Sequence, residues 1–487
     1  MSALAGACAW RRPAASFPAS TADALGDRDA VGLAHAIRSG EVTAAEAMDA
    51  AIARTERVNP QLNFIIEKAY DYGRARAAAA PSGPFGGVPT LIKDLMPLAG
   101  MPTRYGSRAF AQNIEPRQAP YTDALLAAGL APFGKSTTPE FGLTATTEPL
   151  LGGPTRNPWD VTRSCGGSSG GAAVAVASRA VPIAHASDGG GSVRIPASCN
   201  GLVGLKLSRR REIMSGRPQQ GLSLSVNGCV SHSVRDTATW LSVTERNDAG
   251  APLAPTGLVT GANTRRLRIV LSIADARGRE PDPAVRAATE SAAELCRALG
   301  HTVIEARPAI DGEQFSADFI LLWAEGAAEV VQMVRQAAGP DADLTALLEP
   351  LTLDLAQHFA GQPRDSLAAA LQRLQAVGAQ YAAIFENADV MLTPVLASPP
   401  PPLGYISPTL GMAVGFARVL DYVGYTPLQN VSGGAAISLP LAWSPEGLPI
   451  GAHFSAPVGG ERVLLELAYE LEQARPWIGR RPPVNAG

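Results

Sequence analysis

The sequence has 487 residues, of which 46% are hydrophobic and 17% are charged, and 41 Lys and Arg against 44 Asp and Glu give a formal net charge of -3. This composition provides enough apolar material for a large core and excludes a disordered chain. The near-neutral charge argues against a protein that binds duplex nucleic acid, which needs a strong positive field.

The N-terminal part changes from a loose segment to regular structure. Residues 1–25 are rich in Ala, Ser and Pro and are expected to form a flexible arm. Thr43 and Glu46 then have the spacing of a capping box, which starts a helix, and Asn59–Pro60 is expected to stop it. Residues 87–94 form a short apolar run between turn-forming residues, which predicts a buried strand.

Strand and helix signals alternate from there to the C-terminus, which predicts an α/β sheet. The expected elements are, in order, a helix at 122–130, a strand at 130–133, a helix at 172–178, a strand at 181–186, a strand at 267–271, a helix from Pro283 to Gly300, a strand at 302–304, mostly helix over 312–385, a strand at 390–392, a hairpin formed by 435–443 and 448–454, and an amphipathic helix at 463–471. Residues 245–265 and 398–410 are expected to be connections because they are rich in Gly, Pro or Asn.

Cysteine and histidine usage argues against a metal site. The five cysteines are widely spaced without a C-x-x-C pair, and the six histidines form no H-x-x-x-H pattern, so we expect no metal and free thiols in a reducing compartment, the cytoplasm. No run of about 18 apolar residues lacks a charge, so no membrane span is expected. The N-terminus also has its basic pair after its apolar residues, the wrong order for a signal peptide.

The densest chemical signal is two glycine clusters that each contain or precede serine. Residues 166–171 hold Ser168 and Ser169, and residues 189–191 are three glycines directly before Ser192. Glycines let backbone N–H groups approach a ligand closely, so the second cluster could present several donors beside one hydroxyl. This arrangement suits a serine nucleophile with an oxyanion hole.

A serine nucleophile needs a base, and no histidine lies in a diagnostic context. Lys93 is the charged residue that ends the apolar run 88–92. Burial would lower its pKa and leave a free lone pair near neutral pH, as a base requires. Taken alone, Lys93 could equally be a lysine whose ammonium reaches solvent from the end of a strand.

Two other interpretations of the clusters remain open from the residues alone. The first is a loop that cradles phosphate, although G-x-x-x-x-G-K-[ST] and G-x-G-x-x-G are missing around it. The second is a nucleophile elbow in which Ser168 attacks and a downstream histidine is the base. The second cluster would then have no role.

Over roughly residues 25–480 the sequence resembles the amidase signature family. The resemblance is carried by 87–94, 166–171, 188–196 and 201–206. It implies an α/β fold with a central mixed β-sheet surrounded by α-helices, in a single domain over 26–487. Within that domain, the signature core covers about 86–210 and a variable substrate-pocket region about 310–430.

The resemblance also implies a set of site residues. Ser192 matches the nucleophile, Ser168 matches a serine preceded by a cis peptide bond, and Lys93 matches the base of a Ser–cisSer–Lys triad. The expected supporting groups are the amides of Gly189, Gly190, Gly191 and Ser192 as the oxyanion hole, Ser169 as a hydrogen-bonding partner, and Asp188 and Arg194 as a brace of the glycine turn. Apart from the resemblance, Cys199 beside the signature and Arg209 in the basic loop after it are candidate pocket residues.

The function implied by the resemblance is hydrolysis of a C–N bond through an acyl-enzyme, without metal or cofactor. Residues 146–149, 155–159, 182–185 and 476–482 are most similar to the branches that hydrolyse 6-aminohexanoate cyclic dimer, aryl amides or urethanes. The expected partner is therefore a small apolar amide, aryl amide, nylon-type oligomer or carbamate. A glutamine amidase subunit of an amidotransferase and a non-catalytic binding protein remain alternatives, and the oligomeric state stays open although family members are often dimers.

Overall fold

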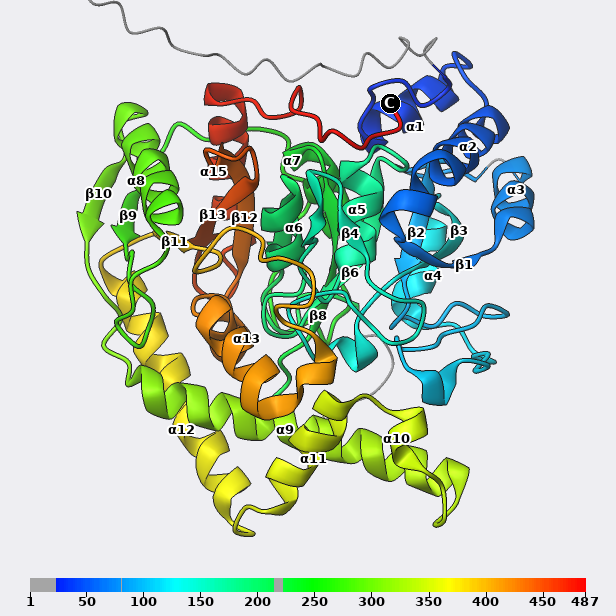
Figure 1. The fold of residues 1–487 in the computed structure, drawn as a ribbon. Helices are drawn as coiled ribbons and strands as arrows, with labels where there is room; N and C mark the ends of the chain where they lie inside the picture. The colour runs from blue at the N-terminus through cyan, green and yellow to red at the C-terminus, as the bar shows by residue number, and fades with distance from the viewer. Residues whose placement is uncertain (1–22, 80, 214–221) are drawn as a thin grey trace, which may run out of the picture.

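The computed structural model describes residues 23–79, 81–213 and 222–487, and two β-sheets lie at its centre with helices around them (Figure 1). The predicted flexible arm, 1–25, falls almost entirely on residues 1–22, outside the described residues. Of the part that is described, Leu25 is buried, and Asp23 accepts two hydrogen bonds from Arg54 of the first long helix.

Within the described residues the larger sheet has eight strands. Their order is β10 (Thr302–Glu305), β9 (Arg268–Leu271), β11 (Val390–Pro394), β13 (Pro449–Ser455), β12 (Ala436–Trp443), β7 (Val203–Lys206), β8 (Val226–Ser231) and β6 (Ile183–Asp188). The first three strands are parallel, and every later neighbour pair is antiparallel. The sheet is therefore mixed, and the predicted fold class is confirmed.

A smaller sheet lies against the edge strand β6. It comprises β1 (Ile65–Lys68), β3 (Ala131–Ser136) and β2 (Pro89–Lys93) in that order, with β2 parallel and β1 antiparallel to β3. The Thr90 hydroxyl on β2 donates to the Ile183 carbonyl on β6 at 2.9 Å. This contact joins the two sheets and brings the C-terminal end of β2 beside the end of β6. A separate two-stranded ribbon pairs β4 (Arg156–Asn157) with β5 (Asp160–Ser164).

Helices cover the sheets and build a second layer at one end. Those around the sheets are α1 (Ala30–Arg38), α2 (Ala44–Leu62), α3 (Tyr70–Ala78), α4 (Pro120–Ala127), α5 (Gly170–Ala177), α6 (Arg194–Asn200), α7 (Val234–Thr244), α8 (Pro283–Ala298), α14 (Pro427–Ser432) and α15 (Glu461–Ala474). Those in the lower part of Figure 1 are α9 (Gly312–Ala338), α10 (Leu344–Leu347), α11 (Pro350–Ala360), α12 (Ser366–Ala383) and α13 (Ala417–Tyr422), the last preceded by a π-helical turn, η5 (Gly411–Phe416). Every residue of α5 is Gly, Ala or Val and is buried, because small side chains let this helix pack between other elements on all sides.

Most predicted elements are present, although several boundaries were wrong: the helix expected at 122–130 is α4, which ends at Ala127, and the strand expected at 181–186 is β6, which ends at Asp188. The capping box of Thr43 and Glu46 starts α2, and the predicted hairpin is β12 with β13. Pro60 does not stop α2, which continues to Leu62. A proline this close to the C-terminus disturbs only the last turn, and Asn63, with φ 54°, ends the helix in the left-handed conformation. Among the elements that the pattern missed are α1, β1, α3, α6, β7, β8 and α7.

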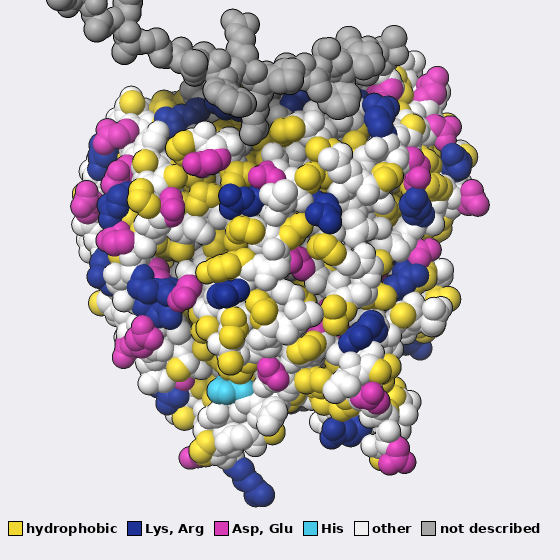
Figure 2. Space-filling model, viewed as in Figure 1, with side chains coloured by type: hydrophobic (Ala, Val, Ile, Leu, Met, Phe, Trp, Pro, Cys, Tyr) yellow, Lys and Arg dark blue, Asp and Glu magenta, His cyan; other side chains and the backbone are white. Residues whose placement is uncertain are grey.

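The described cysteines are buried free thiols: Cys165, Cys199, Cys229 and Cys296. None of the helices in the described ranges is long and apolar enough to cross a membrane. On the face shown in Figure 2, basic and acidic side chains are interspersed, in keeping with the near-neutral net charge.

Candidate active site

Lys93 is the last residue of β2, a strand in which every residue is buried. Its Nζ lies 2.8 Å from the Ser168 Oγ, 2.8 Å from the Ser169 Oγ and 3.0 Å from the Ser187 Oγ. All three neighbours are neutral hydroxyls, and no described carboxylate forms an ion pair with this amine. The amine is therefore not engaged in a solvent-facing salt bridge.

The surroundings of Lys93 favour its uncharged form. The side chain is fully buried, and this burial lowers the pKa of Lys93 to about 7, although the negative charge of Asp188 acts in the opposite direction. A lysine with such a pKa has a free lone pair in a large part of the molecules at neutral pH. This is the property that a base next to a serine hydroxyl requires.

Ser168 and Ser169 lie just before α5 in a segment that runs very close to other backbone. The Gly167–Ser168 peptide bond is cis, as the resemblance implies. A Cβ at Gly167 would lie 2.5 Å from the Thr146 carbonyl oxygen, so the segment can approach this closely only with glycine there. The two serine hydroxyls then reach the same amine from consecutive positions.

Ser192 lies in the turn that joins β6 to α6. The Ser169 amide donates to the Ser192 carbonyl at 3.3 Å, which ties the two glycine–serine segments together. Gly191, directly before Ser192, has φ +129°, and a Cβ there would lie 2.3 Å from the Thr426 Oγ1. Glycine is therefore required both for the backbone conformation and for the space. Ser192 itself lines a cavity.

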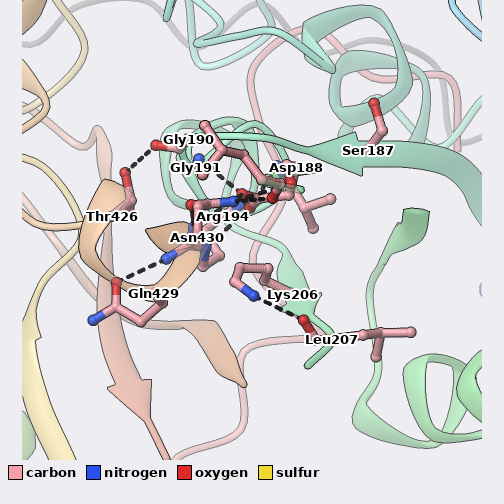
Figure 3. A network of polar contacts seen from close by, with 12 residues as sticks. Ser187, Asp188, Gly190, Gly191, Arg194, Lys206, Leu207, Thr426, Gln429 and Asn430 are labelled. Atoms are coloured by element: carbon pink, nitrogen blue, oxygen red, sulfur yellow. Dashed lines mark hydrogen bonds and ion pairs between the residues drawn. The ribbon is translucent and has the colours of Figure 1, made fainter. Parts of the chain in front are cut away.

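An ion pair buried beneath this turn holds its shape (Figure 3). The Asp188 carboxylate accepts from Arg194 Nε and Nη2, each at 2.9 Å, and from the Gly191 amide at 2.8 Å. Both charged side chains are fully buried. Burial opposes ionisation of Asp188, but the charge and hydrogen bonds of Arg194 outweigh it and hold the pKa of Asp188 well below its usual range.

Residues of α14, far away in the sequence, complete the support of the turn. Arg194 also donates to the Asn430 Oδ1 at 2.7 Å and to the Gln429 Oε1 at 3.2 Å. Just before α14, the Thr426 hydroxyl donates to the Gly190 carbonyl at 2.7 Å, as Figure 3 shows. The turn before Ser192 is thus held by two contacts: the Asp188 carboxylate binds the Gly191 amide, and the Thr426 hydroxyl binds the Gly190 carbonyl.

The structure revises the expected set of oxyanion donors. The Gly191 N–H donates to Asp188 and is not free, because it closes the turn. The amides of Gly190 and Ser192 have no hydrogen-bond partner in the described part of the chain, and both residues line the cavity. The Gly189 amide also has no hydrogen-bond partner among the described residues, but Gly189 is not one of the residues that line the cavity.

The cavity beside Ser192 has mainly apolar walls. Phe319 and Trp323 of α9 stack with ring centroids 5.4 Å apart and planes at 23°. The Trp323 indole N–H donates to the Leu143 carbonyl at 3.0 Å, which fixes the ring. Further lining residues come from 142–145, 190–195, 275–277 and 416–427. The wall therefore combines parts of the predicted signature core with parts of the predicted pocket region.

Two charged residues occur among the described cavity residues, and both are engaged. The Asp275 carboxylate accepts from Arg279 at 2.8 Å and 2.9 Å. Arg277 donates to the Leu420 carbonyl at 2.7 Å. A group entering this cavity therefore meets mainly hydrocarbon and aromatic surface.

The two predicted pocket residues are not on the cavity wall. Cys199 is buried within α6, and its Sγ lies 3.4 Å from the Tyr422 hydroxyl. The Arg209 guanidinium is not available to the cavity, because it donates to the carbonyls of Ser223, Asn430 and Val431. Neither is among the residues that line the cavity.

Sequence reasoning missed several residues that build the site. Ser187 contacts the Lys93 amine. The only feature of the sequence that could have pointed to Ser187 is its position two residues before the glycine cluster 189–191. Thr426 and Asn430 stand more than 200 positions away from the glycine turn, and nothing in their local pattern marks them. Within the described ranges, no group of three or more His, Cys, Asp or Glu side chains is placed to hold a metal ion.

The chain is similar to known amidases over most of its length. A family model described as "Amidase" matches residues 46–465. The chain is 44% identical over 456 residues to "Putative amidase AmiC" of Mycobacterium leprae (strain TN), covering 93% of this chain and 97% of the relative. It is 34% identical over 491 residues to the 6-aminohexanoate-cyclic-dimer hydrolase of Paenarthrobacter ureafaciens, covering 94% and 97%.

Solved structures show the same similarity. The structure of 6-aminohexanoate cyclic dimer hydrolase complexed with substrate superposes with a TM-score of 0.84 at 32% identity, covering 94% of this chain and 99% of that one. A bacterial aryl acylamidase described as a member of the amidase signature enzymes reaches a TM-score of 0.83 at 24% identity, covering 95% and 100%, and supports the fold.

Proposed function

The chain belongs to the amidase signature family, and from this premise we propose that it hydrolyses an uncharged, apolar amide through an acyl-enzyme formed on Ser192. The observation that carries the proposal is a fully buried amine, that of Lys93, 2.8 Å from the Ser168 hydroxyl, in a segment whose next residue, Ser169, donates its amide to the Ser192 carbonyl. A buried lysine without a carboxylate partner is costly for a fold, and its retention is explained by a task that needs a neutral amine.

In the proposed first step, Lys93 accepts a proton from Ser168 while Ser168 accepts one from Ser192. The Ser192 Oγ then attacks the amide carbon and a C–O bond forms. The negative charge moves to the carbonyl oxygen, where the free amides of Gly190 and Ser192 would stabilise it.

Collapse of this intermediate breaks the C–N bond. The proton returns from Lys93 through Ser168 to the nitrogen, so that the leaving group departs as a neutral amine. Water then attacks the ester on Ser192 by the same proton route in reverse, which releases the carboxylic acid and restores the hydroxyl. Ser169 and Ser187 would hold the Lys93 amine in place throughout these steps.

The cavity supports an apolar substrate over glutamine. Glutamine carries an α-ammonium and an α-carboxylate, which need opposite charges for binding. The charged residues on the described cavity wall, Asp275 and Arg277, are already bonded to protein groups. The stacked rings of Phe319 and Trp323 instead offer surface for an alkyl or aromatic group. Nylon-type oligomers, aryl amides and carbamates all fit this description.

A chromogenic panel would test the proposal. The substrates share the 4-nitroaniline or 4-nitrophenol leaving group and vary the acyl part from acetyl to hexanoyl and benzoyl, with matched esters and carbamates. We expect hydrolysis of the apolar anilides, with a loss of about 10³-fold or more in Ser192→Ala and in Lys93→Ala.

Ser198→Ala is the matched control. Ser198 is a buried serine on the helix after the turn, and its Oγ accepts from the Gly451 amide at 2.9 Å. This variant should retain turnover. Hydrolysis by Ser192→Ala at the wild-type rate would overturn the proposal. Release of ammonia from glutamine, with no activity on the panel, would favour the amidotransferase alternative, and a folded wild type that turns over neither would favour a binding protein.

A further inference from the structure

A histidine outside the triad contacts the backbone of Lys93. His185 lies in the middle of β6, is fully buried, and its Nδ1 accepts a hydrogen bond from the Lys93 N–H at 3.2 Å. Strand β2 pairs with β3 on its other side, so this side chain takes the place of a backbone acceptor at the open edge of β2. A histidine that accepts through Nδ1 must be neutral and carry its proton on Nε2.

The groups behind the ring fix this tautomer. His185 Nε2 lies 3.3 Å from the Asn227 Oδ1, the acceptor that an Nε2–H needs. Asn227 is itself oriented, because its Nδ2 donates to the Glu212 Oε1 at 2.9 Å and its backbone amide donates to the other oxygen of Glu212. The Tyr121 ring packs against the imidazole, with 5.7 Å between the two ring centroids. The ring can therefore neither rotate nor exchange its donor and acceptor without breaking a buried hydrogen bond.

Strand β6 thus contacts Lys93 both at its backbone amide and at the amine of its side chain. His185 takes the backbone amide, and two residues later Ser187 contacts the Nζ at 3.0 Å. The same strand then leads through Asp188 into the turn that carries Ser192. A shift of β2 relative to β6 would therefore change the distances from the Lys93 amine to Ser187 and to the turn that carries Ser192.

The geometry points to His185, locked by Asn227 and Glu212, as the positioning residue that sets the depth of Lys93 in the site. This inference rests on the proposed function, since it assigns His185 a task in a reaction that needs a neutral Lys93. Among the described residues, the charged or titratable groups around the imidazole are Lys93 and Lys135 from the small sheet, Tyr121 from α4, Cys229 opposite His185 on β8, and Glu212 behind Asn227. Burial first, and then the charge of Lys93, lower the pKa of His185 to about 3, so the ring stays neutral at working pH.

The test compares three variants by the pH dependence of kcat/KM. His185→Leu removes the acceptor, lets the end of β2 move toward solvent and lessens the burial of Lys93. The acidic limb of the profile should then move to higher pH by about one unit, which lowers kcat/KM about fivefold at pH 7 and about tenfold well below pH 7, since one pKa unit is a tenfold change in the protonation equilibrium. His185→Asn keeps an amide oxygen near the position of Nδ1 and should recover most of that loss.

Thr90→Val is the matched structural control. It removes a different hydrogen bond between β2 and β6, toward the end of β2 that lies away from Lys93. We expect a lower Tm without movement of the acidic limb. A folded His185→Leu with an unmoved limb, or a Thr90→Val that moves the limb equally, would overturn the inference.

Two further measurements keep the outcomes distinct. If Lys93→Ala hydrolyses the panel like the wild type, the proposed function fails, whereas an inactive Lys93→Ala with an unchanged His185→Leu profile removes only the positioning role. The tautomer can be read in the wild type by two-bond ¹H–¹⁵N spectra of protein labelled on histidine, so the test does not depend on the variants folding. We expect a neutral Nε2–H ring at pH 6, and a charged or Nδ1–H ring would contradict the inference.

Discussion

Replacing Lys93 with methionine should abolish hydrolysis and at the same time stabilise the fold. Burial lowers the pKa of this amine from its usual 10.5 to about 7. A shift of this size disfavours the folded state by about 5 kcal/mol at and below pH 7, taking 1.36 kcal/mol per pKa unit. Methionine has a similar length and removes that penalty. It also removes the contacts of Nζ with three serine hydroxyls, worth about 1 kcal/mol each, so a net gain of about 2 kcal/mol is expected.

The pH dependence gives the sharper test of this reasoning. Between pH 7 and 10.5 the unfolded wild type holds one more proton at Lys93 than the folded wild type, so the contribution of this residue to the free energy of unfolding rises with pH. The advantage of Lys93→Met should therefore be largest at or below pH 7. It should shrink by about 2–3 kcal/mol between pH 7 and pH 9.

Urea denaturation followed by tryptophan fluorescence at the two pH values would measure this. Lys135→Met is the matched control, because Lys135 is an equally buried lysine that lies 3.3 Å from the Asp94 carboxylate. Removing it leaves that carboxyl without its partner, so this variant should lose stability. A Lys93→Met no more stable than the wild type at pH 7, or a gap that does not change with pH, would refute the reasoning that the buried amine is neutral.

Four further outcomes follow from the site. The wild-type kcat/KM should fall about tenfold per pH unit below pH 7, as Lys93 becomes protonated, and a flat pH–rate profile would contradict this. Arg194→Met should cost about 3–5 kcal/mol in urea denaturation, because it strands the buried Asp188 carboxylate, and a loss under 1 kcal/mol would be inconsistent with a buried pair. Gly191→Ala should lower kcat by about 100-fold, since its Cβ would displace the turn from Thr426, and normal turnover would show that the turn tolerates the shift. Trp323→Ala should lower kcat/KM for the benzoyl anilide about tenfold more than for the acetyl anilide, and an equal loss for both would place the acyl group elsewhere.

The parts of the site that the sequence predicts are those encoded locally. The glycine clusters before Ser168 and Ser192 follow from backbone requirements that only glycine meets, and Gly167 and Gly191 show these requirements directly. Lys93 stands out because a charge at the end of an apolar strand is rare. The hairpin β12–β13 and the capping box of α2 likewise depend on neighbours within a few residues.

The parts that the sequence did not predict depend on contacts between distant segments. Asn430 and Thr426 have no local pattern, and they matter only because α14 packs against the turn before Ser192. His185 lies in no diagnostic sequence context, because its contact with Lys93 arises from the approach of one sheet to another. The Gly191 amide was assigned to the oxyanion hole because spacing alone does not show that Asp188 already uses it. Such long-range pairings are set by topology rather than by periodicity.

Covalent labelling with an alkyl fluorophosphonate tests the central claim most directly. The reagent phosphonylates an activated serine hydroxyl and releases fluoride, so intact mass and peptide mapping identify the nucleophile. We predict one adduct, on Ser192, formed at a rate that rises with pH through about 7 and absent from both Ser192→Ala and Lys93→Met. An adduct on Ser168 or on another residue, or a Ser192 adduct that forms equally fast without Lys93, would contradict the account.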